Sequence, residues 1–561
     1  MSDIEPLPED LVATLRRPAA LSAALAGGSP PGENDVILLQ THISHLFLTR
    51  DRVFKLRKAV RLPFLSFATR EERNLDCLRE VELNRRLAPD VYLGVAPVLR
   101  GETGGWRLGE PRETLSDEGG RPIGRGGPGA EHCVVMRRLP DGRDALSMLE
   151  AGQLERRHVE ALAERLVAFH RATHLGTPAP WSPEEWLARV ERPVVETFAL
   201  ARTKGGAVLE ASALDRAEDA MTRWLDDHRS AVLARREAGR AVDGHGDLHL
   251  DHVWYPEDAG PPVVIDCIEF DAELRRIDVA GELAFFTMDA AYRGGEPLGE
   301  RLLSCYAALA DDYGLYDVVD YHVLHRALVR ASVAAVACSE EEIDEAQRTR
   351  AAESARRHLE MVEERLDRQS RALIVLTTGL PGTGKSTVAA VAARALGGVV
   401  ISSDRVRKHR AGLAPTERGD VGPDAGIYTA EQTEAVYAGL LERARPVLAS
   451  GRPVVLDATY SQASRRADVR ARAEALGVTA LLLDVRCPES TTLARIEARL
   501  RDPERVSDAG VEVYQRRKEA FESPSEWPSV TRIPVDTARD DWPEGLRAAL
   551  ERVAGFLSGS G

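Results

Sequence analysis

The chain has 561 residues, of which 43% are hydrophobic and 29% charged, and its formal net charge at pH 7 is −15. This length exceeds what one hydrophobic core usually serves, so we expect several domains. The acidic balance disfavours broad binding to nucleic acid or to an anionic membrane, because both need a basic surface. The sequence shows neither a long apolar run nor a basic leader segment, and we expect a cytoplasmic protein without a membrane partner.

Cysteine and lysine are both used sparingly. The 6 cysteines are scattered without a C-x-x-C pair, which disfavours a disulfide framework and a zinc ribbon. Lysine occurs at only six positions, so arginine carries nearly all of the positive charge. Because lysine is a compact point charge and arginine a wide planar fork, a site that needs one small cation beside a phosphate cannot exchange them freely. Two of the lysines, Lys55 and Lys385, fall in motifs described below.

The first part of the chain predicts a small β-rich lobe. Residues 1–34 form a preamble whose helical segment ends in a stretch rich in Gly and Pro. From residue 36 onward, β-branched runs broken by short polar turns predict an antiparallel meander, and residues 69–88 show helical spacing. Together with a strand region at 91–100, these elements predict a small lobe over about 35–140.

The next part predicts a larger helical lobe. Residues 153–235 and 296–366 are mostly helical by periodicity, and a loop-and-strand segment, 242–270, lies between them. These segments predict a helical lobe over about 141–368, which joins the small lobe in one domain over 35–368.

Beyond a boundary near residue 369 the pattern changes again. Over residues 369–561, short buried strands alternate with helices, which predicts an α/β domain with a parallel sheet. The expected strands are 373–377, 398–402, 453–457 and 479–485.

A phosphate-binding loop opens this C-terminal domain. The segment GLPGTGKS satisfies G-x-x-x-x-G-K-S/T, with a buried strand before it and an alanine-rich helix after it. In such a loop, backbone N–H groups face the phosphates of ATP, Lys385 reaches the β- and γ-phosphates, and Ser386 holds Mg²⁺. The predicted nucleotide-binding residues are Gly379, Leu380, Pro381, Gly382, Thr383, Gly384, Lys385, Ser386 and Thr387.

Polar residues after the following strands suggest the rest of this site. Asp457 ends a buried strand and is a candidate Mg²⁺ ligand, although a strand-end turn would explain it too. Asp404 and Arg407 follow the second strand, at the edge where open α/β sheets bind ligands. Arg495 and Arg499 share one helix face and are either catalytic arginines or part of a solvated basic face.

This region resembles the P-loop kinases that phosphorylate small molecules or the 5′-hydroxyl of polynucleotides. The resemblance implies that Asp404 accepts the proton of the acceptor hydroxyl and that Arg407 holds an anionic group; a helix cap is the alternative role for Asp404. In such kinases a lid supplies arginines, here Arg495 and Arg499, that neutralise charge on the transferred phosphoryl group.

Residues 245–252, HGDLHLDH, admit a metal interpretation and a kinase interpretation. Histidine and aspartate are potential zinc ligands, and DLHLDH differs at one position from the H-x-H-x-D-H signature of metallo-β-lactamase-type hydrolases. The difference removes a ligand histidine, and the next histidines, His322 and His325, lie in a predicted helix. The sequence therefore favours the kinase interpretation.

A kinase site needs partners elsewhere in the chain, and these occur in the required order. Strand RVFKLRK presents Lys55, which could reach the α- and β-phosphates of ATP, and Glu80 in the next helix could pair with it. Asp266 follows Asp247 by 19 residues, close to the interval between the catalytic-loop and Mg²⁺-binding aspartates of kinases. Each of these residues alone is often structural, but the ordered set predicts a kinase site.

These residues, with HGD in place of HRD, resemble the aminoglycoside phosphotransferase branch of the kinase fold. The resemblance implies that Asp247 is the catalytic base and Asp266 a Mg²⁺ ligand. No Gly-rich loop precedes Lys55, so backbone N–H groups and Ser44 of QTHISHL would cover the phosphates. His252 stands where the family has an Asn as a second metal ligand; imidazole can bind a metal, whereas Mg²⁺ prefers oxygen.

As a whole, the sequence resembles bacterial proteins described as bifunctional aminoglycoside phosphotransferase/ATP-binding proteins. The resemblance implies an α+β two-lobed protein-kinase-like domain followed by an α/β P-loop NTPase domain, with two ATP·Mg²⁺ sites that transfer γ-phosphoryl groups to hydroxyls of small molecules. Two alternatives stay open. The N-terminal half could be a regulatory or binding module that controls the P-loop domain, or the basic run at 405–410 could serve a nucleic-acid 5′-hydroxyl kinase.

Overall fold

The computed structural model describes residues 4–25, 36–62, 65–101, 104–112, 131–206, 208–258, 260–338, 344–368, 370–414, 417, 426–500 and 511–557. The chain forms two compact units. The first comprises Met1–Ala179 and Gly239–Asp289, and the second comprises Pro180–Ala238 and Ala290–Gly561. The boundary expected near residue 369 divides the chain into two continuous stretches. Each observed unit instead combines two stretches that are separate in the sequence.

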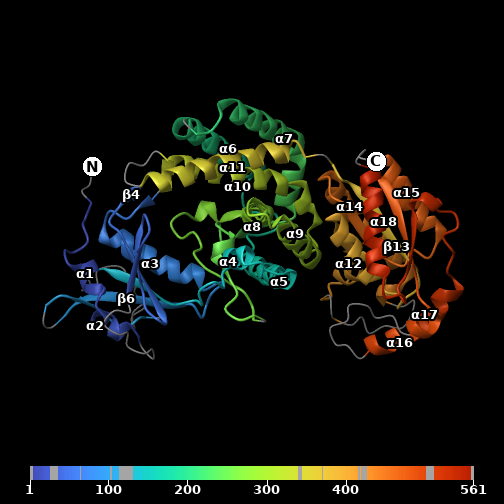
Figure 1. Ribbon diagram of the computed structural model, residues 1–561, viewed down its shortest axis with the longest axis horizontal. Helices are drawn as coiled ribbons and strands as arrows, with labels where there is room; N and C mark the ends of the chain where they lie inside the picture. Colours follow the sequence, from blue (N-terminus) through green and yellow to red (C-terminus); the bar gives the residue numbers. More distant parts are fainter. Residues whose placement is uncertain are drawn as a thin grey trace. The chain divides into compact units, whose positions relative to one another are not determined.

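A six-stranded antiparallel sheet forms the core of the first unit, with strand order β1-β2-β3-β8-β6-β7 (Figure 1). Neighbouring residues of a strand face opposite sides of the sheet. On β8, Cys133 packs with helices α1 (Leu11–Leu15) and α2 (Pro18–Leu21), whereas Val134 packs with α3 (Arg70–Asn84). In sheet order the strands are Ile37–Gln40, Ser44–Leu48, Arg52–Arg57, His132–Arg137, Tyr92–Arg100 and Trp106–Leu108.

Helix α3 begins at a capping box, which determines where the helix starts. Thr69 accepts a hydrogen bond from the Glu72 backbone N–H (3.2 Å), and the Glu72 carboxylate accepts one from the Thr69 backbone N–H (2.9 Å). The buried face of the helix then carries Cys77, Glu80 and Val81. This start therefore places an acidic side chain, Glu80, against the sheet.

Two short antiparallel pairs of strands bring two loops of the first unit together. Strand β9 pairs with β12, and β10 pairs with β11. The loop 244–252 leaves β9 and the loop 265–270 leaves β11, and they meet where the His245 ring contacts Ile265 O (2.8 Å). The bounds are β4 Arg61–Leu62, β5 Leu65–Ser66, α4 Ala145–Glu150, α5 Arg156–Ala172, β9 Ala241–Asp243, η2 Leu250–His252, β10 Val253–Trp254, β11 Val263–Val264, η3 Ala272–Leu274, β12 Arg276–Asp278 and α8 Val279–Tyr292.

A five-stranded parallel sheet with order β14-β15-β13-β16-β17 lies in the second unit (Figure 1). Helices α12 (Lys385–Leu396) and α18 (Trp542–Leu557) pack in one hydrophobic core with it, through Val388 and Leu546. The parallel sheet expected from the sequence is confirmed, and each of its four expected strands agrees with an observed strand to within one residue at either end. In sheet order the strands are Val399–Ser402, Val454–Asp457, Leu373–Thr378, Thr479–Arg486 and Arg532–Asp536.

Helices make up most of the remaining structure. Among the described residues, no helix combines the length and the apolarity that crossing a membrane requires. The bounds are η1 Ser22–Leu25, α6 Pro183–Gly205, α7 Ala211–Glu237, α9 Glu296–Ala310, η4 Tyr313–Asp317, α10 Val319–Cys338, α11 Glu345–Leu366, α13 Ser403–Arg410, η5 Gly426–Tyr428, α14 Ala430–Ala449, α15 Ala463–Ala475, α16 Glu489–Leu500, α17 Val511–Glu519 and η6 Ser529–Thr531.

Arg452, just before strand β15, joins the parallel sheet to helices α9 and α10. Its Nε donates to Glu300 Oε2 (2.8 Å) and its Nη1 to Asp320 Oδ2 (2.7 Å). Arg365 of α11 donates to the other oxygen of Asp320 (2.7 Å). This charged contact helps to explain why the helices after residue 290 belong to the same compact unit as the parallel sheet.

We expect Arg452→Ala to lower the free energy of unfolding of the second unit by about 3 kcal/mol, because Glu300 loses its hydrogen-bonded cation and Asp320 is left with Arg365 alone. Removing one partner of a buried ion pair usually costs about 3–5 kcal/mol. We expect the lower value here, since 32% of the Asp320 side chain is exposed. Burial alone would raise the pKa of Glu300 and of Asp320, but Arg452 holds both below their ordinary values. Their stabilisation is therefore present above the ordinary carboxylate pKa of about 4 and is lost as the pH falls further. Urea unfolding of the variant and of the unmodified protein at several pH values measures this difference in the free energy of unfolding.

Arg445→Ala is the matched control for this experiment. Arg445 lies on α14, is 64% exposed and is 3.9 Å from Asp317. Such a surface pair contributes little, so we expect a change below about 0.5 kcal/mol. Equal changes for the Arg452 and Arg445 variants would contradict the stabilising role of the Arg452 contact.

Candidate active sites

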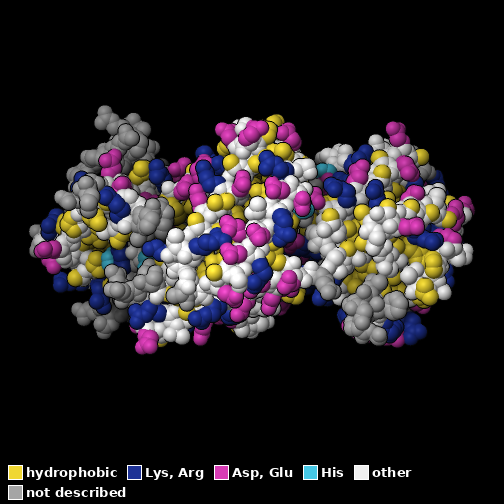
Figure 2. All heavy atoms as spheres, turned by 90° about the horizontal axis from the view of Figure 1, so that it is seen from above, with side chains coloured by type: hydrophobic (Ala, Val, Ile, Leu, Met, Phe, Trp, Pro, Cys, Tyr) yellow, Lys and Arg dark blue, Asp and Glu magenta, His cyan; other side chains and the backbone are white. Residues whose placement is uncertain are grey.

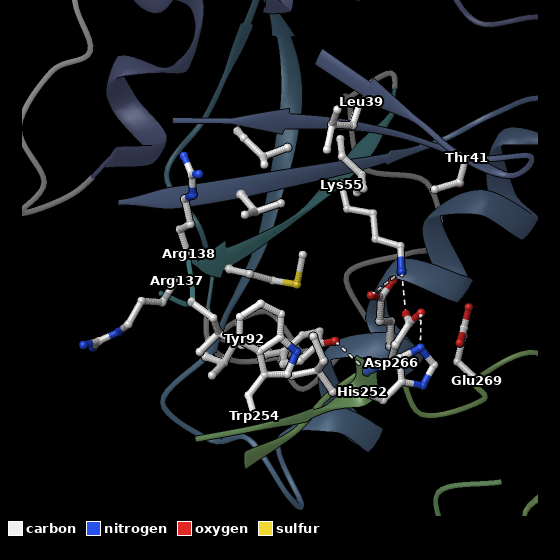
Figure 3. Close-up of a pocket in the computed structure, with 18 of the residues that line it drawn as sticks. Leu39, Thr41, Lys55, Tyr92, Arg137, Arg138, His252, Trp254, Asp266 and Glu269 are labelled. Atoms are coloured by element: carbon white, nitrogen blue, oxygen red, sulfur yellow. Dashed lines mark hydrogen bonds and ion pairs between the residues drawn. The ribbon is translucent and has the colours of Figure 1, made fainter. Parts of the chain in front are cut away.

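A cavity of about 520 Å³ lies between the six-stranded sheet and the β10–β11 pair of the first unit (Figure 3). Lys55, Asp266 and His252 gather at one end of it. Most of the remaining wall is apolar, which suits a flat aromatic ligand such as a nucleobase. The apolar lining includes Leu39, Leu46, Leu48, Val53, Met136, Trp254 and Ile265.

Lys55 on β3 bridges two carboxylates at the charged end of the cavity. Its Nζ donates to Glu80 Oε1 (2.8 Å) and to Asp266 Oδ1 (2.9 Å). Glu80 is fully buried, and the lysine side chain is 12% exposed. Burial alone would lower the pKa of Lys55, but Asp266 and Glu80 outweigh burial and raise it, so the lysine stays charged. The structure thus brings together three residues that the sequence assigned to one site.

Arg57, two residues further along β3, is a second buried cation for which the sequence suggested no role. Its Nη2 lies 2.6 Å from Asp76 Oδ2, 2.8 Å from Glu80 Oε2 and 2.5 Å from Glu269 Oε1. Burial raises the pKa of Glu269 to about 8, and the charges of Asp76 and Glu80 add to the increase, although Arg57 opposes it. The only signal for Arg57 in the sequence was its position on the same strand face as Lys55.

Ser44 belongs to this buried network rather than to the cavity. Its hydroxyl accepts a hydrogen bond from Arg57 Nη1 (3.0 Å), and the residue is fully buried. The cavity wall instead includes Thr41 and Ile43 of the same turn. We therefore correct the expectation that Ser44 covers a nucleotide phosphate, because its hydroxyl is engaged by a buried cation.

The loop that carries Asp247 is fastened to helix α8 by Glu282. The two Glu282 oxygens accept hydrogen bonds from the backbone N–H groups of His245 (2.5 Å) and Gly246 (2.9 Å). Burial lowers the pKa of His245 to about 4, so its ring is neutral at physiological pH. The His245 ring contacts Ile265 O and thereby joins this loop to the loop of Asp266.

Asp247 pairs with His249, a residue without a predicted role. His249 Nε2 lies 3.1 Å from Asp247 Oδ2, and His249 Nδ1 contacts Asp251. Burial alone would lower the pKa of His249, but the two aspartates raise it to about 10. Burial alone would raise the pKa of Asp247, but His249 holds it well below its ordinary value. The loop therefore presents Asp247 as a carboxylate.

Asp266 faces His252 across the end of the cavity (Figure 3). Its φ of 63° lies in the left-handed region that few residues other than glycine adopt, and its N–H donates to Tyr92 Oη (3.2 Å). Asp266 Oδ2 lies 3.6 Å from His252 Nε2. Lys55 holds the pKa of Asp266 far below its ordinary value, against the effect of burial. The two predicted metal ligands of this half thus lie side by side.

The predicted P-loop joins β13 to α12 in the second unit. Gly382 and Gly384 have φ values of 82° and 90°, which favour glycine. A Cβ on Gly382 would lie 2.7 Å from Ile496 Cγ1, so glycine is needed there for space as well. Lys385 Nζ donates to Leu380 O across the loop (2.8 Å). All of the predicted nucleotide-binding residues, Gly379–Thr387, lie in this turn and in the start of α12.

Asp457 and Ser386 form an oxygen-donor pair beside this loop. Asp457 ends β15, the strand next to β13, and its carboxylate is hydrogen-bonded to Ser386. Burial raises the pKa of Asp457, although Ser386 and Lys385 oppose the shift. The charge of Asp404 adds to the increase. A hydroxyl and a carboxylate are ligands that Mg²⁺ accepts.

Arg407 is buried beside Asp404, with which it shares helix α13. It is 8% exposed, its Nη1 donates to Ile427 O (2.7 Å) and to Thr433 Oγ1 (3.3 Å), and its guanidinium lies 4.9 Å from the centre of the Tyr428 ring. Burial lowers the pKa of Arg407, although Asp404 opposes the shift. A guanidinium with carbonyl and hydroxyl partners retains charge that an anionic ligand could neutralise.

Arg495 reaches the P-loop through Thr537 rather than directly. Its Nη1 donates to Thr537 Oγ1 and its Nη2 to Thr537 O, both at 2.9 Å. Thr537 Oγ1 in turn donates to Thr383 O in the loop (2.8 Å). This geometry holds Arg495 at the rim of the loop, whereas the sequence suggested a lid arginine. The side chain of Arg499 lies outside the described residues.

Comparisons with known proteins bear on both halves of the chain. Residues 374–524 match a family model described as an AAA domain. The Mycobacterium tuberculosis protein named "Uncharacterized protein Rv2004c" is 33% identical over 433 residues, which span 77% of this chain and 80% of that protein. This chain belongs to the same family as that mycobacterial protein. A match of this length cannot fit within residues 369–561, so the family also shares part of the N-terminal half.

Further similarities are confined to smaller parts of the chain. A "UPF0200 protein" of Aeropyrum pernix is 40% identical over 136 residues, which span 24% of this chain and 67% of that protein. A gluconokinase structure from Sinorhizobium meliloti is 25% identical and covers 34% of this chain and 99% of its own, with a TM-score of 0.25. The AAA match and the parallel sheet make the C-terminal domain of this family member a P-loop α/β domain.

We expect Gly382→Ala to weaken ATP binding at the P-loop about tenfold or more, because the new Cβ forces Ile496 or the loop to move. Gly397→Ala is the control, since Gly397 has a φ of 65° but open space around its Cβ position. That variant should lose stability without losing affinity. Titration with a fluorescent ATP analogue, in a Lys55→Ala background, measures the change, and equal affinity in the two glycine variants would contradict it.

We expect the thermal stability of the first unit to depend on His249 at alkaline pH. Because the folded pKa of His249 is about 10, its stabilisation is complete below the ordinary histidine pKa of about 6.5 and is lost as the pH rises through 10. The unfolding temperature of His249→Gln should therefore fall less over this range than that of the unmodified protein. His174→Gln, at an exposed position, should behave like the unmodified protein.

Proposed function

We propose that this protein is an ATP- and Mg²⁺-dependent phosphotransferase with two nucleotide sites, which transfers γ-phosphoryl groups to hydroxyls of small molecules. The observation that carries the second site is the Lys55 bridge between Glu80 and Asp266, at the charged end of a cavity with apolar walls. The P-loop of the C-terminal domain supplies the other site.

At the C-terminal site, the loop and its neighbours have the chemistry that phosphoryl transfer needs. Backbone N–H groups of the loop and Lys385 would contact the phosphates, and Ser386 and Asp457 would hold Mg²⁺. Mg²⁺ neutralises charge on the phosphate oxygens when it is bound with ATP. The oxygen of the acceptor hydroxyl would form the new bond to the γ-phosphorus while the bond between that phosphorus and ADP breaks. Asp404 would accept the proton that the hydroxyl loses.

At the N-terminal site, the apolar walls would hold the adenine and Lys55 would contact the phosphates. Asp266 and His252 are the residues that could hold a metal ion there. Asp247 would orient the acceptor hydroxyl. Because its pKa is far below the ordinary value, Asp247 is a weak base and would take the proton only when bond formation to phosphorus is well advanced.

The burial of two basic residues argues against a polynucleotide acceptor. In the basic run of α13, Arg407 is 8% exposed and Lys408 is 1% exposed, so an extended phosphate backbone cannot lie along them, although a small anion could still reach Arg407. On the face drawn in Figure 2, acidic and basic side chains of the described residues are interspersed. A small-molecule acceptor therefore fits better. An N-terminal half that regulates the P-loop domain is the second candidate, favoured by His252 at a position where Mg²⁺ prefers oxygen.

Three variants test the proposal through phosphoryl transfer to a metabolite pool, read by mass shift. We expect Lys55→Ala and Asp247→Ala to abolish one set of products and Lys385→Ala another, each by about a hundredfold or more. Lys58→Ala and Lys518→Ala are matched controls that lie outside both sites and should keep full activity. If Lys385→Ala alone abolishes all transfer, the N-terminal half is a regulatory module and the two-site proposal fails.

A further inference from the structure

His252 directs one ring nitrogen at Asp266 because its other nitrogen is already engaged. His252 Nδ1 lies 2.9 Å from the backbone O of Asp247. A carbonyl oxygen only accepts hydrogen bonds, so Nδ1 carries the proton, and in a neutral ring Nε2 keeps its lone pair. That Nε2 lies 3.6 Å from Asp266 Oδ2. With the ring neutral, the two facing atoms are both acceptors.

Two acceptors that face each other at this separation repel unless a cation lies between them. Lys55 does not fill this role, because it donates to Oδ1, the other oxygen of Asp266. The carbonyl contact at Nδ1 is the kind of partner that fixes the tautomer of a metal-ligating histidine. The short separation and the tautomer of His252 therefore both favour a bound cation between His252 Nε2 and Asp266 Oδ2.

Nearby side chains define which atoms remain available as ligands. Asp247, His249 and His252 can each place one ligand atom within 4.8 Å of the others. Both ring nitrogens of His249 are engaged by Asp247 and Asp251, however, so His249 is committed to holding the loop. His252 Nε2 and Asp266 Oδ2 are left as a mixed nitrogen and oxygen pair.

We propose that this pair binds a first-row transition-metal dication in preference to Mg²⁺. Magnesium prefers oxygen donors, whereas imidazole nitrogen suits Fe²⁺, Ni²⁺, Cu²⁺ and Zn²⁺, and Mn²⁺, the weakest binder of the first-row series, is the most stringent probe of such a site. The P-loop site differs, since Ser386 and Asp457 offer only oxygen. The two sites of one chain would thus select different metals. This inference rests on the proposed function, in which nucleotide phosphate oxygens complete the coordination at each site.

Manganese binding to the full chain, followed by electron paramagnetic resonance of free Mn²⁺ without nucleotide, tests the proposal. The Asp457→Asn background removes the oxygen site of the P-loop domain. We expect one Mn²⁺ that Mg²⁺ displaces only at tenfold or greater excess, and His252→Asn should weaken Mn²⁺ binding at least tenfold. His228→Asn, which changes a histidine of the second unit that stacks on Trp224, should leave binding unchanged.

A measurement on the protein with His252 intact guards against a variant that fails to fold. Pulsed electron paramagnetic resonance should detect a nitrogen coupled to the bound Mn²⁺, and His252→Asn should remove it. Equal affinity for Mg²⁺ and Mn²⁺, absence of the nitrogen coupling, or unchanged binding in His252→Asn would overturn the proposal and leave a protonated histidine paired with Asp266. Because no nucleotide is present, nitrogen-coupled Mn²⁺ would support the metal inference even if Lys55→Ala left phosphoryl transfer intact.

Discussion

Glu80 holds the candidate site of the first unit in place. Its two carboxylate oxygens bind Lys55 and Arg57, two of the three cations of strand β3, and Glu80 itself is fully buried. A buried carboxylate that lost either cation would be strongly destabilising, so helix α3 and strand β3 must stay in this register. Lys55 is thereby held where its remaining hydrogen bond reaches Asp266. The position of the helix, the strand and the loop at 266 thus depends on one buried side chain.

The second unit positions its site by sheet topology instead. Strands β14, β15 and β13 are neighbours in the parallel sheet, and their carboxyl ends lie at one edge. Asp404 follows β14, Asp457 ends β15, and Ser386 follows the loop after β13. Three polar residues that are far apart in the sequence are therefore placed at one edge by the order of the strands. This is the edge at which open parallel sheets bind ligands.

What the sequence could predict followed from how local each feature is. The P-loop, its flanking strand and helix, and four strands of the parallel sheet were predicted because each pattern spans only a few residues. The order of Lys55, Glu80 and Asp266 indicated their meeting, but only the fold shows that Lys55 contacts both acids. The role of Ser44 was mispredicted because its partner, Arg57, lies on the neighbouring strand, and strand pairing does not show in the local pattern.

Features that depend on distant segments could not be predicted in this way. Arg495 lies on a helix with an ordinary basic face, and only the return of β17 brings Thr537 beside it. Each compact unit likewise combines segments that are distant in the sequence, and within the second unit Arg452 binds helices that precede the P-loop domain. In both cases an arginine contacts a segment that is far from it in the sequence. Only the three-dimensional fold brings the two segments together.

The contrast between lysine and arginine unites these observations. Arg57, Arg73 and Arg452 are buried, and each binds one or more carboxylates through its wide fork, so each joins segments in the interior of the protein. Lys55 and Lys385 instead place a compact charge at a cavity end and at a phosphate-binding loop. A guanidinium in either place would need room for several donors, whereas an ammonium can direct one charge at a phosphate oxygen. Buried arginines in this chain therefore join segments of the interior, whereas Lys55 and Lys385 place their charge at the two candidate phosphate sites.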